Sequence, residues 1–371
     1  MTQARGEDRR WMAAAIALAR RGVGRVWPNP AVGCVIVSGG RVVGRGWTQP
    51  GGRPHAEAMA LAAAESLSPG AARGATVYVS LEPCAHFGRT PPCADALIAA
   101  GVARVVAPME DPDPRVSGGG FARLRAAGLA VETGLMAAEA ASVNAGFLMR
   151  QRARRPFLTL KLAATLDGRI ATASGESRWI TGPAARARVH LLRARNDGVL
   201  VGAATARADD PALDIRIPGL QDHAPLRLVI DAALTLPPTL KLAAPSQAAM
   251  AWRLHDRNIA GAAADWGEPV AIAPGTDGRL DLHDMMAVLG ARGLTRVLCE
   301  GGGRLGAALL RAGLVDEMVW FSAGAAIGAE GAPALGPLGL AHLAGAPRFD
   351  PVHHERLGKD LMSVWRPRRE T

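Results

Sequence analysis

Three residues whose side chains bind zinc, His55, Cys84 and Cys93, stand in the N-terminal part of the sequence, and Glu57 follows the histidine by two positions. One imidazole and two thiolates leave the fourth tetrahedral position of a zinc ion for water, as in catalytic rather than structural sites. Zinc lowers the pKa of that water towards about 7, so hydroxide is available at neutral pH. Glu57 would take its proton and deliver it to a ring nitrogen and to leaving ammonia. This set is typical of zinc nucleobase deaminases.

Each half of the set has an ordinary explanation when it is taken alone. A His-x-Glu pair commonly just begins a helix, and two cysteines nine positions apart commonly arise by chance or pack in a core. Their order, and their place at predicted strand-to-helix junctions, favours the metal site. His86 is a second candidate ligand, although a histidine beside a ligand loop more often lines a pocket.

The elements that must position these residues alternate between strands and helices. An amphipathic helix over 11–19 comes first, and apolar periodicity then predicts strands over 34–37, 42–44, 76–81 and 102–107 and helices over 55–65, 94–100 and 121–127. This is a three-layer α/β pattern. His55 and Glu57 lie about 200° apart around their helix, so the histidine must act from the entering loop while the glutamate points into the cleft.

The polar, basic stretch 151–156 is predicted to be a linker, which divides the chain into domains over 1–150 and 151–371. The second series has strands over 157–162, 198–201, 226–230, 270–273 and 296–299, helices over 183–194, 282–292 and 305–312, and a closing strand over 317–321. The Ala- and Pro-rich segment 237–267 resists assignment.

The bulk composition narrows the class of protein. With 49% hydrophobic and 20% charged residues, 371 residues build ordinary globular cores. A net charge of +10 that is spread along the chain favours anionic small molecules, while 4% aromatics argue against a base-stacking nucleic-acid surface. Four irregularly spaced cysteines are no disulfide framework, and the apolar stretch 11–19 is too short to cross a membrane, so we expect a cytoplasmic protein with free thiolates.

A glycine-rich segment, Cys299–Gly306, is predicted to lead from a strand into a helix. Amide groups at such a helix start hold phosphate, although a plain glycine turn is the simpler alternative. Gly301, Gly303 and Gly306 have the spacing of a Rossmann fingerprint. We reject that fold because too little sequence follows the motif and no acidic residue ends the next strand.

Three motifs of the first half, residues 28–34, 54–57 and the twelve-residue block 82–93, resemble the bifunctional riboflavin-biosynthesis deaminase/reductase family. Residues 161–169, 174–181, 208–213 and 300–305 extend the resemblance through the chain. The common deaminase pattern has two residues between its cysteines, whereas eight stand here, and we expect residues 89–92 of this loop to rim the pocket. Thr48 stands where the family often has histidine, and Thr165 where serine is expected.

The resemblance implies a fold, two reactions and their residues. It implies a cytidine-deaminase-like three-layer α/β/α domain, followed by a dihydrofolate-reductase-like α/β domain that uses NADPH. The first would bind one Zn²⁺ and deaminate 2,5-diamino-6-(5-phosphoribosylamino)pyrimidin-4(3H)-one, and the second would reduce the ribosyl group of the product to ribityl. Cofactor contacts fall on Ala163, Trp179, Thr205, Asp209, Gly302, Gly303, Arg304, Leu305, Gly306, Ala307 and Ala308. Substrate contacts fall on Asn29, Lys161, Ser177, Arg193, Leu213, Arg216 and Glu300. A homo-oligomer, dimer or tetramer, is also implied.

Two of these residue types have their own physical argument. Arg193 and Arg216 suit a ribose phosphate because guanidinium binds phosphate in a bidentate manner, although a solvated surface charge is the ordinary role of an arginine. Lys161 is one of only three lysines and interrupts an apolar strand, so we expect it to project into a cleft.

Two other classes of function compete with this interpretation. A zinc deaminase of nucleic acid or of free bases, with a nucleotide-binding appendage, would need an aromatic strand channel, and the chain has one Tyr and six Phe. A structural zinc module joined to a nucleotide-binding regulator would lose nothing on replacing Glu57 with Gln, whereas a deaminase would lose its turnover.

Overall fold

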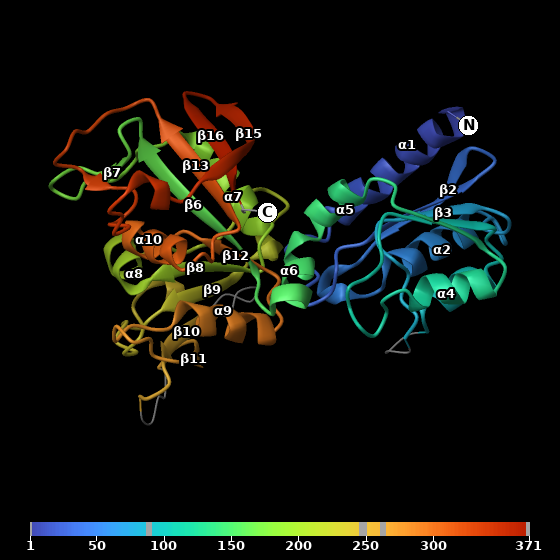
Figure 1. The fold of residues 1–371 in the computed structure, drawn as a ribbon, viewed down its shortest axis with the longest axis horizontal. Helices are drawn as coiled ribbons and strands as arrows, with labels where there is room; N and C mark the ends of the chain where they lie inside the picture. The colour runs from blue at the N-terminus through green and yellow to red at the C-terminus, as the bar shows by residue number, and fades with distance from the viewer. Residues whose placement is uncertain (1, 87–90, 245–250, 260–264, 369–371) are drawn as a thin grey trace. The chain divides into compact units, whose positions relative to one another are not determined.

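The computed structural model describes residues 2–86, 91–244, 251–259 and 265–368, and divides into two compact units, Met1–Arg154 and Arg155–Thr371 (Figure 1). The predicted linker lies at this division, but its first residues continue a helix that ends at Ala153. No helix in the described part of the chain has both the length and the apolarity that a bilayer crossing needs.

The first unit is a five-stranded sheet with helices on both faces. Its strands have the order β2-β1-β3-β4-β5, with β1 antiparallel to both neighbours and β3, β4 and β5 parallel. The strands are β1 (Gly33–Ser38), β2 (Arg41–Trp47), β3 (Thr76–Val79), β4 (Arg104–Ala107) and β5 (Ala130–Thr133). The helices are α1 (Thr2–Ala19), α2 (Ala56–Leu67), α3 (Cys93–Ala99), α4 (Gly119–Ala126), α5 (Ala137–Val143) and α6 (Ala145–Ala153).

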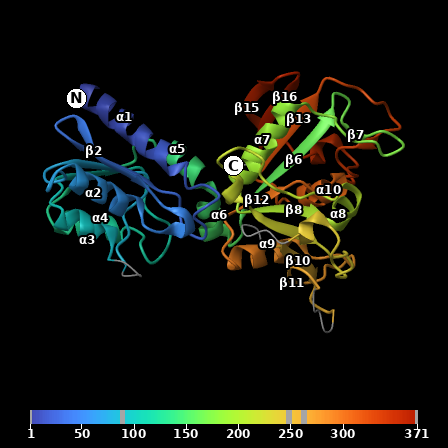
Figure 2. The ribbon, with the colours of Figure 1, turned by 180° about the vertical axis from the view of Figure 1, so that it is seen from behind.

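Two apolar clusters separate the three layers of this unit. Helices α1 and α5 lie side by side on one face in both views (Figure 1; Figure 2) and pack around Met12 and Ile16. Helices α2, α3 and α4 cover the other face around Leu97 and Phe121. The predicted three-layer pattern is therefore confirmed.

Helix α2 lies directly against strand β2, which fixes the start of the helix. A Cβ atom added at Gly46 would stand 2.4 Å from the carbonyl oxygen of Ala56, and one added at Gly44 would stand 2.2 Å from that of Ala60. Only glycine permits this approach. The residues at the N-terminus of α2 are thereby held at a set height above the sheet.

The second unit is built on a nine-stranded sheet of order β11-β10-β9-β8-β12-β6-β13-β16-β15. The seven strands from β11 to β13 run parallel, β16 is antiparallel to β13, and β15 is antiparallel to β16. The strands are β6 (Phe157–Thr165), β8 (Gly198–Gly202), β9 (Leu226–Ile230), β10 (Ala251–Asp256), β11 (Glu268–Ile272), β12 (Arg296–Cys299), β13 (Glu317–Ala323), β15 (Phe349–Leu357) and β16 (Asp360–Pro367). Strands β7 (Arg169–Ala171) and β14 (Ala332–Pro333) form a separate pair.

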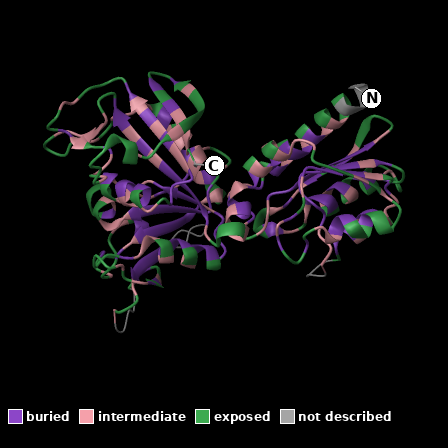
Figure 3. Cartoon of the chain, viewed as in Figure 1, coloured by how far each residue is buried: buried purple, intermediate pink, exposed green. Residues whose placement is uncertain are grey.

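The helices of this unit are α7 (Pro183–Ala194), α8 (Ala203–Asp209), α9 (Leu282–Ala291) and α10 (Gly303–Arg311). Burial is greatest in the central parallel strands, whereas the outward faces of helices such as α9 are exposed (Figure 3). The expectation that a strand over 317–321 closes the series is wrong, because the hairpin β15–β16 follows and extends the sheet. The segment that resisted assignment contains β10.

Candidate active sites

The three predicted zinc ligands come together from three connected elements. His55 directly precedes α2, Cys84 lies in the loop after β3, and Cys93 is the first residue of α3. The His55 Nδ1 atom is 3.6 Å from the Cys84 Sγ and 3.4 Å from the Cys93 Sγ. The Cys93 backbone N–H donates to the Cys84 Sγ at 3.3 Å. Three ligand atoms therefore converge from residues far apart in the sequence.

This geometry fits a tetrahedral zinc ion. Bonds of about 2.3 Å to sulfur and about 2.05 Å to nitrogen place those two atoms about 3.6 Å apart, close to the observed 3.6 and 3.4 Å. Among the described residues, the possible metal-binding groups consist of this one triad. His86 lies outside it and lines the adjacent cavity, where its Nδ1 atom is buried without a hydrogen-bond partner in the structure.

Glu57 stands in the first turn of α2 and is only 3% exposed. Burial raises the pKa of its carboxyl to about 7, and the nearby Cys84 thiolate adds to the rise. A carboxyl with a pKa near neutrality both accepts and returns a proton at physiological pH. Cys84 has the opposite shift, since the hydrogen bond from the Cys93 side chain lowers the pKa of its thiol to about 4.

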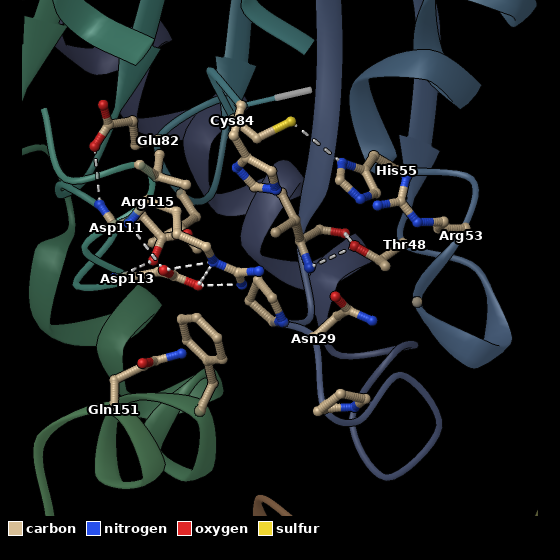
Figure 4. A pocket seen from close by; sticks show the side chains of 18 of the residues that line it. Asn29, Thr48, Arg53, His55, Glu82, Cys84, Asp111, Asp113, Arg115 and Gln151 are labelled. Atoms are coloured by element: carbon tan, nitrogen blue, oxygen red, sulfur yellow. Dashed lines mark hydrogen bonds and ion pairs between the residues drawn. The ribbon is translucent and has the colours of Figure 1, made fainter. Parts of the chain in front are cut away.

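His55 and Cys84 of the metal-binding triad line a cavity of about 320 Å³ (Figure 4). Asn29 lines this cavity and packs against Gly52, where a Cβ atom would meet its side-chain nitrogen at 1.9 Å. Thr48 also lines it, although its hydroxyl accepts a hydrogen bond from the Val32 backbone N–H at 3.0 Å. Residues 87–90 of the cysteine loop lie outside the described residues, so the predicted rim at 89–92 stays a prediction.

Several polar residues of the cavity were not singled out from the sequence. They come from the segment after β4 and from α6, and include Asp111, Asp113, Arg115, Arg150 and Gln151. Burial raises the pKa of Asp111 to about 6, and Arg115 forms a bidentate ion pair with the two oxygens of Asp113. The sequence contained a signal that could have identified two of them. Asp111 and Asp113 follow the carboxyl end of a predicted strand, where ligand-binding residues gather in parallel α/β sheets.

In the second unit the structure brings Lys161, Arg193 and Glu300 together. Arg193 donates from Nε and Nη2 to the two oxygens of Glu300 at 2.6 and 2.9 Å. Burial lowers the pKa of Lys161, and the Glu300 carboxylate opposes that shift. Burial raises the pKa of Glu300, but Arg193 and Lys161 outweigh it and hold that pKa below its usual value. These groups form a compact charged cluster beside β6.

The other predicted substrate contacts differ in exposure. The side chain of Arg216 is 67% exposed and lies 3.5 Å from Asp214, and Ser177 is half-buried. The Leu213 side chain packs in the core of the unit, so a contact from this residue would have to come from its backbone.

The predicted cofactor contacts surround the starts of α8 and α10, which follow the neighbouring strands β8 and β12. Gly302 caps α10 and donates its N–H to the Thr205 hydroxyl at 3.1 Å. No acidic residue stands in the first turn of α10, so the free amides there suit a phosphate group. Ala163 is on β6, Asp209 ends α8, and the Trp179 ring is 68% exposed beneath the Arg186 guanidinium. This cradle fits the phosphates of a dinucleotide.

Comparisons with known proteins match both halves of the chain. Residues 5–109 match the model of the cytidine and deoxycytidylate deaminase zinc-binding region, and residues 156–363 match that of the RibD C-terminal domain. The riboflavin biosynthesis protein RibD of Escherichia coli is 44% identical, over 96% of this chain and 98% of that protein. The RibD protein of Aquifex aeolicus is 37% identical, over 96% and 97%.

Solved structures extend the match to the whole fold. RibD of Acinetobacter baumannii superposes with a TM-score of 0.87 at 36% identity, covering 98% of this chain and 100% of that one. A diaminohydroxyphosphoribosylaminopyrimidine deaminase/5-amino-6-(5-phosphoribosylamino)uracil reductase of Thermotoga maritima gives 0.86 at 32% identity, covering 98% and 99%. The chain therefore belongs to the RibD family of riboflavin biosynthesis proteins, as a zinc-binding deaminase domain joined to a reductase domain.

Proposed function

We propose that the two domains catalyse consecutive steps on one phosphoribosylated pyrimidine. The first hydrolyses the 2-amino group of 2,5-diamino-6-(5-phosphoribosylamino)pyrimidin-4(3H)-one, and the second reduces the ribosyl group of 5-amino-6-(5-phosphoribosylamino)uracil to ribityl with NADPH. The single observation that carries the proposal is the convergence of His55, Cys84 and Cys93 beside the buried Glu57 in a polar cavity. The names of the Thermotoga maritima relative's two activities support the substrates.

In the deaminase step a water oxygen adds to C2 of the ring and ammonia leaves. His55, Cys84 and Cys93 would hold a zinc ion, which would make hydroxide available at neutral pH. Glu57, with a pKa of about 7, would carry one proton of the water to the ring nitrogen and then move the second, from the added hydroxyl, to the departing amine. Asn29, on the cavity wall, would bind the pyrimidine.

In the reductase step the C1′–O4′ bond breaks while C1′ gains a hydride and O4′ gains a proton. NADPH supplies the hydride. Lys161, Arg193, Glu300, Ser177, Leu213 and Arg216 would contact the substrate. Because Arg193 is already paired with Glu300, the more exposed Arg216 is the freer cation for the phosphate.

The cofactor would lie across the starts of α8 and α10. Its phosphates would meet the helix-start amides of residues 303–305, with Gly302 and residues 306–308 as further contacts, and Thr205 holds that loop in place through its bond from Gly302. Ala163, Trp179 and Asp209 would complete the contacts. The choice of NADPH over NADH rests on the family resemblance.

Two wider properties complete the proposal. The edge hairpin β15–β16 exposes Val352 and Leu361 by 49% and 47%, which supports a homo-oligomer, dimer or tetramer, as the resemblance implies. Light scattering of the purified protein tests the proposed oligomeric state.

The free thiols of all four cysteines support a reducing cytoplasmic location.

A coupled assay on the phosphoribosylated pyrimidine, which follows ammonia and NADPH on a sample of measured zinc content, tests the main proposal. One ammonia released and one NADPH oxidised per substrate are expected. Removal of zinc with a chelator should abolish ammonia release, yet leave NADPH oxidation on the deaminated intermediate intact. Ammonia release from single-stranded RNA or DNA instead would overturn the substrate assignment.

A further inference from the structure

The carboxylate of Glu82, two residues before the metal ligand Cys84, is 3% exposed and accepts four backbone hydrogen bonds. Its Oε2 atom receives the N–H groups of Asp111 and Gly118, both at 3.0 Å. Its Oε1 atom receives those of Gly120 and Phe121, at 2.9 and 3.1 Å. One side chain of the metal-ligand loop thus holds both ends of a segment that is remote in sequence.

That segment forms one wall of the cavity, and its shape depends on Glu82. Asp111 in turn accepts the N–H of Asp113 at 2.9 Å, and Asp113 accepts that of Arg115 at 3.0 Å. Figure 4 shows this chain of side chains running from Glu82 through Asp111 to Asp113 and Arg115. Because all of these residues line the cavity, a shift at Glu82 would move the surface that faces the substrate.

Helix α4 makes further contacts that tie the cavity wall to the metal-ligand loop. A Cβ atom at Gly120 would stand 2.0 Å from the carbonyl oxygen of Pro83, so the helix start lies directly on the metal-ligand loop. Arg123 donates to the Ala85 carbonyl oxygen at 3.1 Å and pairs with Asp95 of α3 at 2.6 Å. The loop of Cys84, the helix of Cys93 and the cavity wall are therefore tied together.

We propose that Glu82 is a positioning residue that sets the cavity wall 111–116 relative to the metal ligands, and so places the pyrimidine over them. This inference rests on the proposed deaminase function. A carboxylate is required because four donors need two accepting oxygens. The neutral amide of glutamine offers one oxygen and one NH₂ group, so two of the four N–H groups would lose their acceptor.

The test is Glu82→Gln in the full-length, zinc-loaded protein. We expect the KM for the pyrimidine nucleotide to rise about tenfold or more while kcat changes by less than about threefold, because the wall moves and the metal does not. Zinc content should stay at that of the wild type, and backbone amides of 111–121 should exchange hydrogen faster. An unchanged KM with zinc retained, or a loss of rate that only follows zinc loss, overturns the inference.

Arg123→Met provides a second variant should Glu82→Gln fail to fold, and Arg125→Met, an exposed arginine of the same helix, is its matched control. We expect the KM to rise about threefold in the first and to stay unchanged in the control. Equal KM values in the two variants would refute the inference. An inactive wild-type protein would refute the proposed function and this inference together, whereas an active wild type with unaltered variants refutes the inference alone.

Discussion

The guanidinium of Arg193 meets the carboxylate of Glu300 side-on, with two N–O distances of 2.6 and 2.9 Å, and the two side chains are only 12% and 9% exposed. A third bond from Arg193 reaches the Asp214 carbonyl oxygen at 3.0 Å. Lys161 lies close enough to Glu300 that the charge of each side chain shifts the pKa of the other. The pair thus joins α7 to the end of β12 and shapes the proposed reductase site.

Removing one partner of this ion pair should lower the free energy of unfolding more than removing both partners. Arg193→Met leaves the Glu300 carboxylate buried without its cation, and we expect the free energy of unfolding of the second unit to fall by about 3 kcal/mol. The double variant Arg193→Met/Glu300→Gln should recover part of that loss. Urea unfolding followed by tryptophan fluorescence measures both, and a double variant that is less stable than either single one would contradict the expectation.

Glu57→Gln should abolish deamination without loss of the metal. The amide cannot accept the proton, so ammonia release should fall by about a hundred- to ten-thousand-fold, while zinc content and NADPH oxidation on the deaminated intermediate stay at wild-type levels. Glu65→Gln, an exposed position on the same helix, is the matched control and should leave the rate unchanged. Retained turnover in Glu57→Gln would instead favour a structural zinc module.

Asp8 on α1 should stabilise the first unit in a pH-dependent way. It accepts hydrogen bonds from the Tyr78 hydroxyl at 2.6 Å and from Arg104 at 2.8 and 2.7 Å, and the Arg104 bonds lower its pKa. A lowered carboxyl pKa stabilises the fold above the unfolded value of about 3.9, and that contribution disappears as the pH falls through the folded value.

Asp8→Asn should therefore lower the free energy of unfolding by about 1–2 kcal/mol at pH 7, and the deficit should shrink below about pH 4. Melting temperatures across this range measure it. The control, Glu139→Gln, removes an exposed ion pair with Arg9 of 3.6 Å on the same face and should have little effect at any pH. A deficit that does not depend on pH would rule out the charge as its source.

Gly46→Ala should displace α2 and weaken the metal site. The new methyl group would collide with the backbone of α2 at Ala56, next to His55, and backbone atoms cannot move aside. We expect a loss of stability of about 1–3 kcal/mol and weaker zinc binding in a competition titration. Gly6→Ala is the control, since nothing lies within 4 Å of its added Cβ. Equal zinc affinity in the two variants would contradict this packing argument.

The elements that the sequence predicted best are those with a clear apolar period and a marked end. Helix α7 begins at Pro183 and ends at Ala194, and β9 and β12 also have the predicted bounds. The hairpin β15–β16 was missed because β15 is an edge strand with polar residues on both faces and Pro351 inside it. No alternation marks such a strand.

The zinc ligands were predictable because motifs of chemically specific residues carried them. The roles of Glu82 and Asp111 were not, since they depend on hydrogen bonds between residues 29 to 39 positions apart. Such bonds form only once the loop after β3 and the start of α4 have been placed by the sheet. Local sequence contains no record of that contact.

His55 has a second structural role besides that of a predicted metal ligand, because it is also the N-cap of α2. Serine, threonine, asparagine or aspartate in that place would accept a helix-start N–H and add about 1 kcal/mol, but the His55 side chain makes no such bond. The first turn that carries Glu57 is therefore less stable by itself than it could have been. Zinc bound to His55 would stabilise this turn in place of the missing cap, so we expect the order of the turn to depend on the metal.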